Sequence, residues 1–247
     1  MSPSGPDDAK QDDAKQEVRE RVWDALDRAK VVGFPGVHGR IPNFTGAADA
    51  ARLLAGTDEW QRAATLKANP DMPQLPVRAA ALEAGKAVFM AVPRLREPDP
   101  FLLLDPDRLD VRPRQAASIK GSSIHGVPTA VDAMEPLDLV VCGSVAVNAA
   151  GARIGKGGGY SDLELGLAIE CGLVTDDTVI VTTVHPIQVV DDELPETSHD
   201  FRVDLIVTPD EVIRCPRVAR PPGIVWADLD DDKIAAIPVL AARRPRS

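Results

Sequence analysis

The feature that most constrains the fold is a glycine-rich stretch, residues 151–162, between an apolar segment and a helical pattern. The apolar segment, 137–147, is almost continuously hydrophobic, which is typical of a parallel strand covered on both faces. Glycines permit positive φ and close backbone approach, and the free N–H groups at a helix N-terminus attract anions. The stretch therefore predicts a strand, a phosphate-binding loop and a helix in succession. A flexible surface loop is the alternative.

The glycine-rich stretch does not match the two commonest nucleotide-binding motifs. No Gly-Lys-[Ser/Thr] closes it, so it is not a Walker A loop. Lys156 lies among the glycines and Asp162 follows them, and this arrangement of a basic and an acidic residue does not fit a dinucleotide fingerprint well. If the loop binds phosphate, it belongs to another class of anion site.

Alternation of apolar and amphipathic segments predicts an α/β chain. Helical periodicity covers residues 13–30, 46–55, 57–67, 77–84 and 161–171. Strand patterns cover residues 31–35, 86–92, 101–104, 137–147, 178–184 and 203–208. This order implies a three-layer α/β/α sandwich with a mostly parallel central sheet. We expect a disordered acidic tail over 1–13, a single domain over 14–215 and a C-terminal surface wrap over 216–247.

Composition excludes several classes of protein. The net charge of −10 argues against a nucleic-acid or anionic membrane surface. Cys142, Cys171 and Cys215 are odd in number and widely spaced, so neither a disulfide framework nor a zinc site is indicated. No apolar run reaches the roughly 18 residues of a membrane span, and we expect a cytoplasmic protein. Enrichment in Ala, Arg, Asp and Pro with few lysines fits either a GC-rich genome or a saline cytoplasm.

Two further segments carry candidate ligand contacts. Lys15 and Arg19 are four residues apart and share one helix face, where they either reach an anion or remain solvated. The loop 36–44 follows a predicted strand and places Asn43 and Phe44 at a possible binding edge of the sheet. The loop 120–128 holds serines and a histidine without a nucleophile elbow, so a structural or substrate-lining role is favoured over nucleophilic catalysis.

Three separated segments resemble the 5-formyltetrahydrofolate cyclo-ligase family, also called 5,10-methenyltetrahydrofolate synthetases. They are Arg153-Ile-Gly-Lys-Gly-Gly-Gly-Tyr-Ser-Asp162, the basic helix at 14–19, and residues 194–208 with a His-Asp pair and a strand-opening Asp. The resemblance implies an ATP- and Mg²⁺-dependent enzyme that acts on a small-molecule substrate. It would activate the formyl oxygen of 5-formyltetrahydrofolate as a phosphate ester, and attack by N10 would expel phosphate and give 5,10-methenyltetrahydrofolate.

The resemblance also implies roles for particular residues. Asp162 and Asp204 would hold Mg²⁺, and Lys15, Arg153 and Lys156 would be catalytic. The ATP site would comprise Lys15, Arg19, Arg153, Gly155, Lys156, Gly157, Gly158, Gly159 and Tyr160. The substrate cleft would be lined by Asn43, Phe44, Tyr160 and Ser161. His199 and Asp200 could bind at the site or only fix a turn.

The chain also departs from the family pattern. Many members have a second tyrosine and an arginine where this chain has Ser161 and Leu163. These differences indicate a divergent, archaeal-type branch, in which the nucleotide and metal positions are kept and the substrate cleft differs at Ser161. Two alternatives remain open: an enzyme of the same fold acting on another small formyl or amide metabolite, and a non-catalytic nucleotide-binding module.

Overall fold

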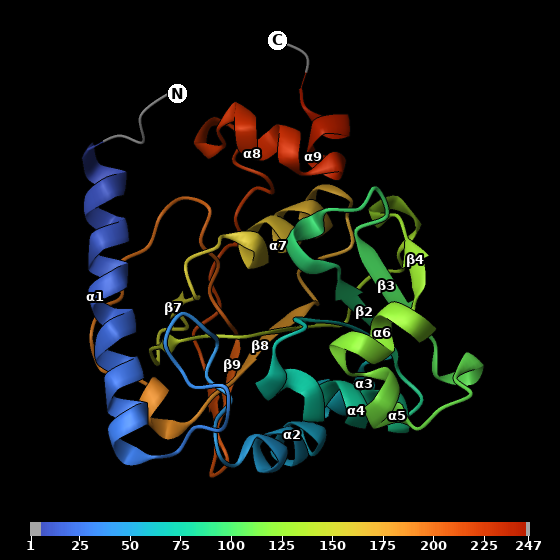
Figure 1. The fold of residues 1–247 in the computed structure, drawn as a ribbon, viewed down its shortest axis with the longest axis horizontal. Helices are drawn as coiled ribbons and strands as arrows, with labels where there is room; N and C mark the ends of the chain where they lie inside the picture. Colours follow the sequence, from blue (N-terminus) through green and yellow to red (C-terminus); the bar gives the residue numbers. More distant parts are fainter. Residues whose placement is uncertain (1–5, 246–247) are drawn as a thin grey trace.

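The computed structural model describes residues 6–245, with side chains from residue 10 onward. An eight-stranded sheet crosses the molecule in the order β10-β9-β8-β5-β1-β2-β3-β4 (Figure 1). Its strands are β1 (Thr65–Ala68), β2 (Ala87–Ala91), β3 (Phe101–Leu104), β4 (Val127–Thr129), β5 (Leu139–Cys142), β8 (Val179–Thr183), β9 (Leu205–Val207) and β10 (Val212–Arg214). The five strands from β9 to β2 are parallel, and β10, β3 and β4 are antiparallel to their neighbours. The predicted mostly parallel sheet is confirmed.

The central strand β5 shows why the sheet is covered on both faces. All four of its residues are buried. Val140 and Cys142 contribute to one hydrophobic core, whereas Leu139 and Val141 contribute to the other. Successive side chains of a strand point to opposite faces, so a continuous apolar strand needs a layer of helices on each side.

Different helices supply the two layers. One core contains residues of α2 (Ala47–Ala55), α4 (Leu75–Glu83) and α5 (Pro113–Ala116). The other contains residues of α7 (Tyr160–Glu170), α8 (Asp231–Ala236) and α9 (Pro238–Arg243). The three-layer α/β/α sandwich is therefore confirmed.

A third cluster joins the long helix α1 (Pro6–Ala29) to a two-stranded antiparallel sheet. Val22, Trp23 and Leu26 of α1 pack with Ala146 of β6 (Ala146–Val147) and Ile154 of β7 (Arg153–Ile154). The glycine-rich loop follows β7, so this cluster holds the basic face of α1 beside the loop. No helix in residues 6–245 is long and apolar enough to cross a membrane.

Several predicted boundaries were wrong. Helix α1 begins at Pro6, so residues 6–13 are helical rather than part of a disordered tail, while residues 1–5 lie outside the described part. The predicted helix 57–67 is only α3 (Asp58–Arg62), after which the chain enters β1. The predicted strand 31–35 is reduced to a single bridge between Val32 and Phe44.

Two other segments also differ from expectation. The loop 120–128 contains α6 (Ile119–His125), whose first turn is capped by the Ser118 hydroxyl. The predicted strand 137–147 is two strands, β5 and β6, because the chain leaves the sheet after Cys142.

The C-terminal segment is more than a surface wrap. Its helices α8 and α9, with Ile237 between them, bury Ile234, Ile237, Val239 and Leu240 in the core that also contains α7 residues. In Figure 1 they lie next to α7. Residues 216–245 thereby cover the side of α7 on which the glycine-rich loop ends.

Candidate functional site

The glycine-rich loop joins β7 to α7 at the carboxyl side of the central strands. Gly157 and Gly159 have φ of 98° and 68°, a backbone conformation that favours glycine. Gly159 immediately precedes α7, and no side chain caps that helix start. The first N–H groups of α7 therefore have no side-chain acceptor from the cap, which is the arrangement found at helix N-termini that bind anions.

Arg19 fixes the loop from the α1 side. Its Nε donates to the carbonyl oxygen of Gly155 at 2.8 Å, and its NH1 donates to Gln16 at 3.2 Å. A Cβ added to Gly157 would lie 3.6 Å from the guanidinium carbon, which shows how closely the cation approaches the loop. Burial lowers the pKa of Arg19, against the opposing effect of Asp12 and Asp200.

Lys15 lies one turn before Arg19 and forms an ion pair with Asp200. The Nζ to Oδ2 distance is 2.5 Å, and both side chains are almost completely buried. Asp200 Oδ2 also accepts from the backbone N–H and the hydroxyl of Thr197. Burial works to raise the pKa of Asp200, but the bonds from Lys15 and Thr197 outweigh it and the pKa is lowered.

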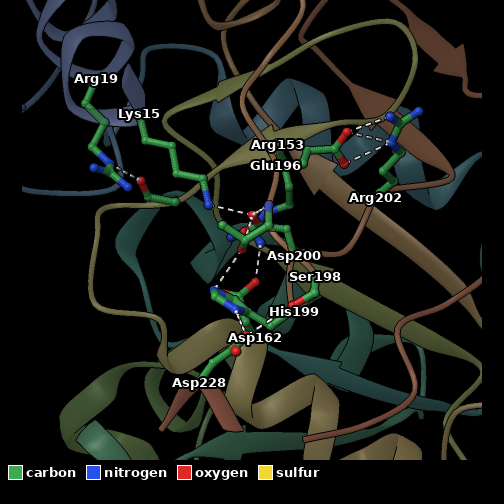
Figure 2. Close-up of polar contacts among 12 residues, drawn as sticks. Lys15, Arg19, Arg153, Asp162, Glu196, Ser198, His199, Asp200, Arg202 and Asp228 are labelled. Atoms are coloured by element: carbon green, nitrogen blue, oxygen red, sulfur yellow. Dashed lines mark hydrogen bonds and ion pairs between the residues drawn. The ribbon is translucent and has the colours of Figure 1, made fainter. Parts of the chain in front are cut away.

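Arg153 is the buried cation at the centre of the site. Figure 2 shows it between Asp200 and Asp162, with Lys15 reaching in from α1. Its NH1 lies 3.2 Å from Asp162 Oδ1, its NH2 donates to the Gly143 carbonyl at 3.3 Å, and its guanidinium stacks on Phe201 at 4.4 Å. Burial works to lower the pKa of Arg153, but Cys142, Asp162 and Asp200 outweigh it and the pKa is raised. The residue is thus a fixed positive charge.

Asp162 lies in the first turn of α7 and is the one predicted metal ligand that faces this cluster. Its side chain is 16% exposed, and Arg153 contacts only one of its oxygens. Within residues 6–245, no group of three acidic, histidine or cysteine side chains could hold a metal without help. A metal at Asp162 would therefore need ligands from elsewhere, such as phosphate oxygens, which is how Mg²⁺ is commonly bound.

Lys156 projects from the loop toward the end of β1. Its side chain is 47% exposed and pairs with Asp71 at 2.8 Å. The segment carrying Asp71 is fixed by Arg78, which is fully buried and donates to the carbonyls of Asn69, Pro70 and Asp71. Burial lowers the pKa of Arg78 to about 10, against the opposing effect of Asp71.

A second buried ion pair lies beneath the loop. Lys67 of β1 pairs with Glu164 of α7, and both side chains are almost fully buried. Lys67 Nζ also donates to Asn69 Oδ1 at 2.7 Å, and Asn69 Nδ2 donates to the Ser161 hydroxyl at 3.3 Å. Ser161, expected to line the substrate cleft, is thus connected through Asn69 to the carboxyl end of β1.

Asp204 is not brought to this site. Its Oδ2 accepts from the backbone N–H of Ile180 at 2.7 Å and from Arg220 at 2.5 Å. Ile180 lies near the amino end of β8. Arg153, which contacts Asp162, instead donates to Gly143, just past the carboxyl end of β5. Asp204 and Asp162 therefore lie at different levels of the sheet. The expectation that they share a metal is corrected.

Phe44 is also displaced from its expected role in the substrate cleft, whereas the role expected of Asn43 stays a prediction. Phe44 is 4% exposed and packs in the core with α2 and α4 residues, so its ring is not part of a cleft wall. The backbone carbonyl of Asn43 accepts from Gly33 at 2.8 Å. The residue of this loop that reaches the site is Ile41, since a Cβ on Gly143 would lie 2.8 Å from its side chain.

A small cavity lies where α7 meets the C-terminal segment. Its volume is about 70 Å³, several times the ~15 Å³ that one water requires. Gly159, Asp162, His199, Asp228 and Lys233 are among the residues that line it. His199 contacts Asp228 at 3.0 Å, so this half of the His-Asp pair faces the C-terminal segment while Asp200 faces Lys15 (Figure 2).

Several residues of the site were not found from the sequence. The helical pattern of 57–67 includes Lys67, and Asn69 and Asp71 lie in the segment after it, for which no element is predicted. Polar residues just after a strand are a signal for a binding edge, but the strand itself is not predicted. Lys233 lies in a segment that was not assigned to the site, and no sequence signal connects it to the loop.

Comparisons with known proteins identify the family of this chain. Residues 11–209 match the model of the 5-formyltetrahydrofolate cyclo-ligase family. The chain is 42% identical over 241 residues to a methenyltetrahydrofolate synthase domain-containing protein of Mus musculus, covering 94% of this chain and 64% of that protein. It is 39% identical over 239 residues to the protein of the same description from Bos taurus, covering 94% and 62%. The chain thus spans less than two thirds of the length of these relatives.

A solved structure shows the same fold. The NMR structure of Aquifex aeolicus 5,10-methenyltetrahydrofolate synthetase superposes with a TM-score of 0.52 at 18% identity, covering 83% of this chain and 94% of the other. The assignment to an archaeal-type branch stays a prediction. Because the family model matches most of the chain, from the basic helix to the last parallel strand, this protein belongs to the 5-formyltetrahydrofolate cyclo-ligase family of ligases.

Proposed function

We propose that this protein converts 5-formyltetrahydrofolate to 5,10-methenyltetrahydrofolate in an ATP- and Mg²⁺-dependent reaction. The observation that carries the proposal is the convergence of Arg19, Arg153 and Asp162 on one glycine-rich loop at a helix N-terminus. Membership of the family supplies the reaction. The formyl oxygen is activated as a phosphate ester, and attack by N10 then expels phosphate.

The residues around the loop fit a triphosphate. Positive φ at Gly157 and Gly159 opens the backbone toward a ligand, and Arg19 lies directly beside the loop. Arg153 is held by the Asp162 carboxylate, the Gly143 carbonyl and the Phe201 ring, so it would stabilise developing phosphate charge without moving. Lys15 and Lys156, held by Asp200 and Asp71, complete the ring of cations.

The acidic partner also fits Mg²⁺. Asp162 keeps one oxygen free of contacts from Arg153, and Mg²⁺ is usually held by one or two carboxylates together with substrate phosphates. Asp204 is not included in this proposal, because Arg220 and the backbone of β8 occupy it. Asp162 thus becomes the single protein carboxylate that holds the metal.

The substrate side of the proposal rests on Tyr160 and Ser161. Tyr160 is partly buried at the first position of α7, where an aromatic face offers stacking area. The Ser161 hydroxyl and the Asn69 amide form a polar pair next to it. This pair would give the cleft hydrogen-bonding groups in place of the second tyrosine common in the family.

The test is ATP-dependent growth of the near-ultraviolet absorbance of the methenyl product with purified protein. Turnover is expected with 5-formyltetrahydrofolate, ATP and Mg²⁺ together and not when any one is omitted. Asp162→Asn should raise the Mg²⁺ concentration for half-maximal rate more than about tenfold, since even an outer-shell partner of a metal is worth 10- to 100-fold. Asp176→Asn, an exposed acid after α7, is the matched control and should leave the rate unchanged.

The same assay separates the alternatives. Phosphate release with a different formylated metabolite, and none with reduced folates, would replace the substrate while keeping the nucleotide site. ATP binding without turnover of any formyl compound would instead support a non-catalytic module.

A further inference from the structure

We propose that Lys233, on the C-terminal helix α8, is an additional phosphate-binding residue of this site. The inference rests on the proposed function, because it assigns a ligand to the same glycine-rich loop. Lys233 lies beyond residue 209, where the match to the family model ends. The match to the family model therefore assigns no role to Lys233.

The position of Lys233 is the first argument. Its Nζ lies 3.2 Å from the point that a Cβ on Gly159 would occupy, and 5.9 Å from the centre of the Tyr160 ring. Gly159 is the last loop residue before α7, so the ammonium group stands beside the uncapped start of the helix. Lys233 also lines the small cavity together with Asp162 and His199.

The second argument is the pairing of the cations around the loop. Lys15, Arg153 and Lys156 each form an ion pair with a carboxylate. Among residues 10–245, no ion pair joins Lys233 or Arg19 to a carboxylate within 4 Å.

Arg19 and Lys233 stand on the two flanks of residues 157–159, one at Gly157 and the other at Gly159. Two cations with no carboxylate within 4 Å among residues 10–245, one near each end of the Gly157–Gly159 segment, are suited to a ligand with several negative charges. A nucleotide triphosphate has that charge distribution.

The third argument is that the C-terminal segment is anchored firmly on α7. Gly166 allows the approach, since a Cβ there would lie 2.8 Å from Ile224 and 3.0 Å from the Gly223 carbonyl. Glu170 accepts from the backbone N–H of Ile224 and from the Trp226 indole, both at 3.2 Å. Further along, Ile234 of α8 is buried in the core. Lys233 is thereby held at the loop by packing on the same helix.

The experiment measures binding of Mg-ATP by titration calorimetry to the full chain and to Lys233→Met, which keeps the aliphatic stem over Tyr160. Loss of one charge-assisted contact predicts a Kd raised about 10- to 100-fold. Lys233→Arg should restore most of the affinity. Arg244→Met is the control, because it removes one positive charge from the same segment at an exposed ion pair with Asp231.

Turnover distinguishes a binding role from a structural one. The KM for ATP should rise in Lys233→Met while the KM for 5-formyltetrahydrofolate and the melting temperature stay close to those of the unaltered protein. Equal ATP affinity in the unaltered protein and Lys233→Met would overturn the assignment of Lys233 alone. Absence of ATP binding to the unaltered protein would overturn the proposed function, and with it the ligand assigned here.

Discussion

The buried ion pair between Lys67 and Glu164 gives a prediction whose magnitude follows from burial. The side chains are 2% and 7% exposed, so neither charge can turn to water if the other is removed. Glu164→Leu would leave the Lys67 ammonium with Asn69 as its remaining partner among residues 10–245. Loss of one member of a buried pair costs about 3–5 kcal/mol. For a chain of this size that corresponds to a melting temperature lower by roughly 6–20 °C.

The assay is urea unfolding of three variants: Glu164→Leu, Lys67→Met and the double variant. Each single variant should lose stability, and the double variant should recover to within about 1 kcal/mol of the unaltered protein, because an apolar pair of similar volume replaces a buried ion pair at little cost. Asp49→Asn breaks an exposed ion pair with Arg52 and should change stability by less than about 1 kcal/mol. A loss below about 1 kcal/mol in Glu164→Leu, or a double variant as unstable as the singles, would refute the reasoning.

Two further predictions concern the loop and the carboxylate beside it. Gly157→Ala forces a side chain into a φ of 98° and should raise the KM for ATP. Gly172→Ala, at φ 68° with open space around it, is the control: it should cost similar stability without changing the KM for ATP. An equal effect of both variants on this KM would count against a role for the loop. Asp200 has a lowered pKa, so its contribution to stability is complete above its ordinary pKa of 3.8 and is lost as the pH falls through the lower value of the folded protein. Urea unfolding between pH 7 and pH 3 should therefore show a smaller loss of stability on acidification in Asp200→Asn, and an unchanged pH dependence would contradict the assigned ion pair.

The parallel strands were predictable where local pattern and tertiary environment agree. Residues 139–142 are apolar because both faces of β5 are covered, and the sequence shows this directly. Strand β1 was missed because Lys67 interrupts its apolar run. A lysine is accommodated there only because Glu164, almost a hundred positions later, meets it across the layer. A local sequence pattern therefore cannot reveal the pairing of Lys67 with Glu164.

In the candidate site, too, some features follow from local sequence and others only from tertiary contacts. The glycine-rich loop and the basic face of α1 were found from local spacing, and the structure brings Arg19 within 2.8 Å of the Gly155 carbonyl. An aspartate at the start of a strand, however, has the same local pattern whether it faces a ligand or an arginine. Asp204 faces Arg220, which the sequence did not connect with it. Lys233 was missed for the converse reason, because its neighbours are set by the packing of α8 on the core.

The pairing of the cations shows how an acidic protein could hold the proposed anion site. The chain carries a net charge of −10, so its overall field repels a polyphosphate and attraction must be local. Lys15 and Arg153 are fixed by Asp200 and Asp162, which keeps buried positive charges from repelling one another before a ligand arrives. Arg19 of α1 and Lys233 of α8, which have no carboxylate within 4 Å in the part of the chain whose side chains are described, then lie near Gly157 and Gly159. On this reasoning, a polyphosphate long enough to contact both Arg19 and Lys233 binds more tightly than a single phosphate, which can contact only one of these cations.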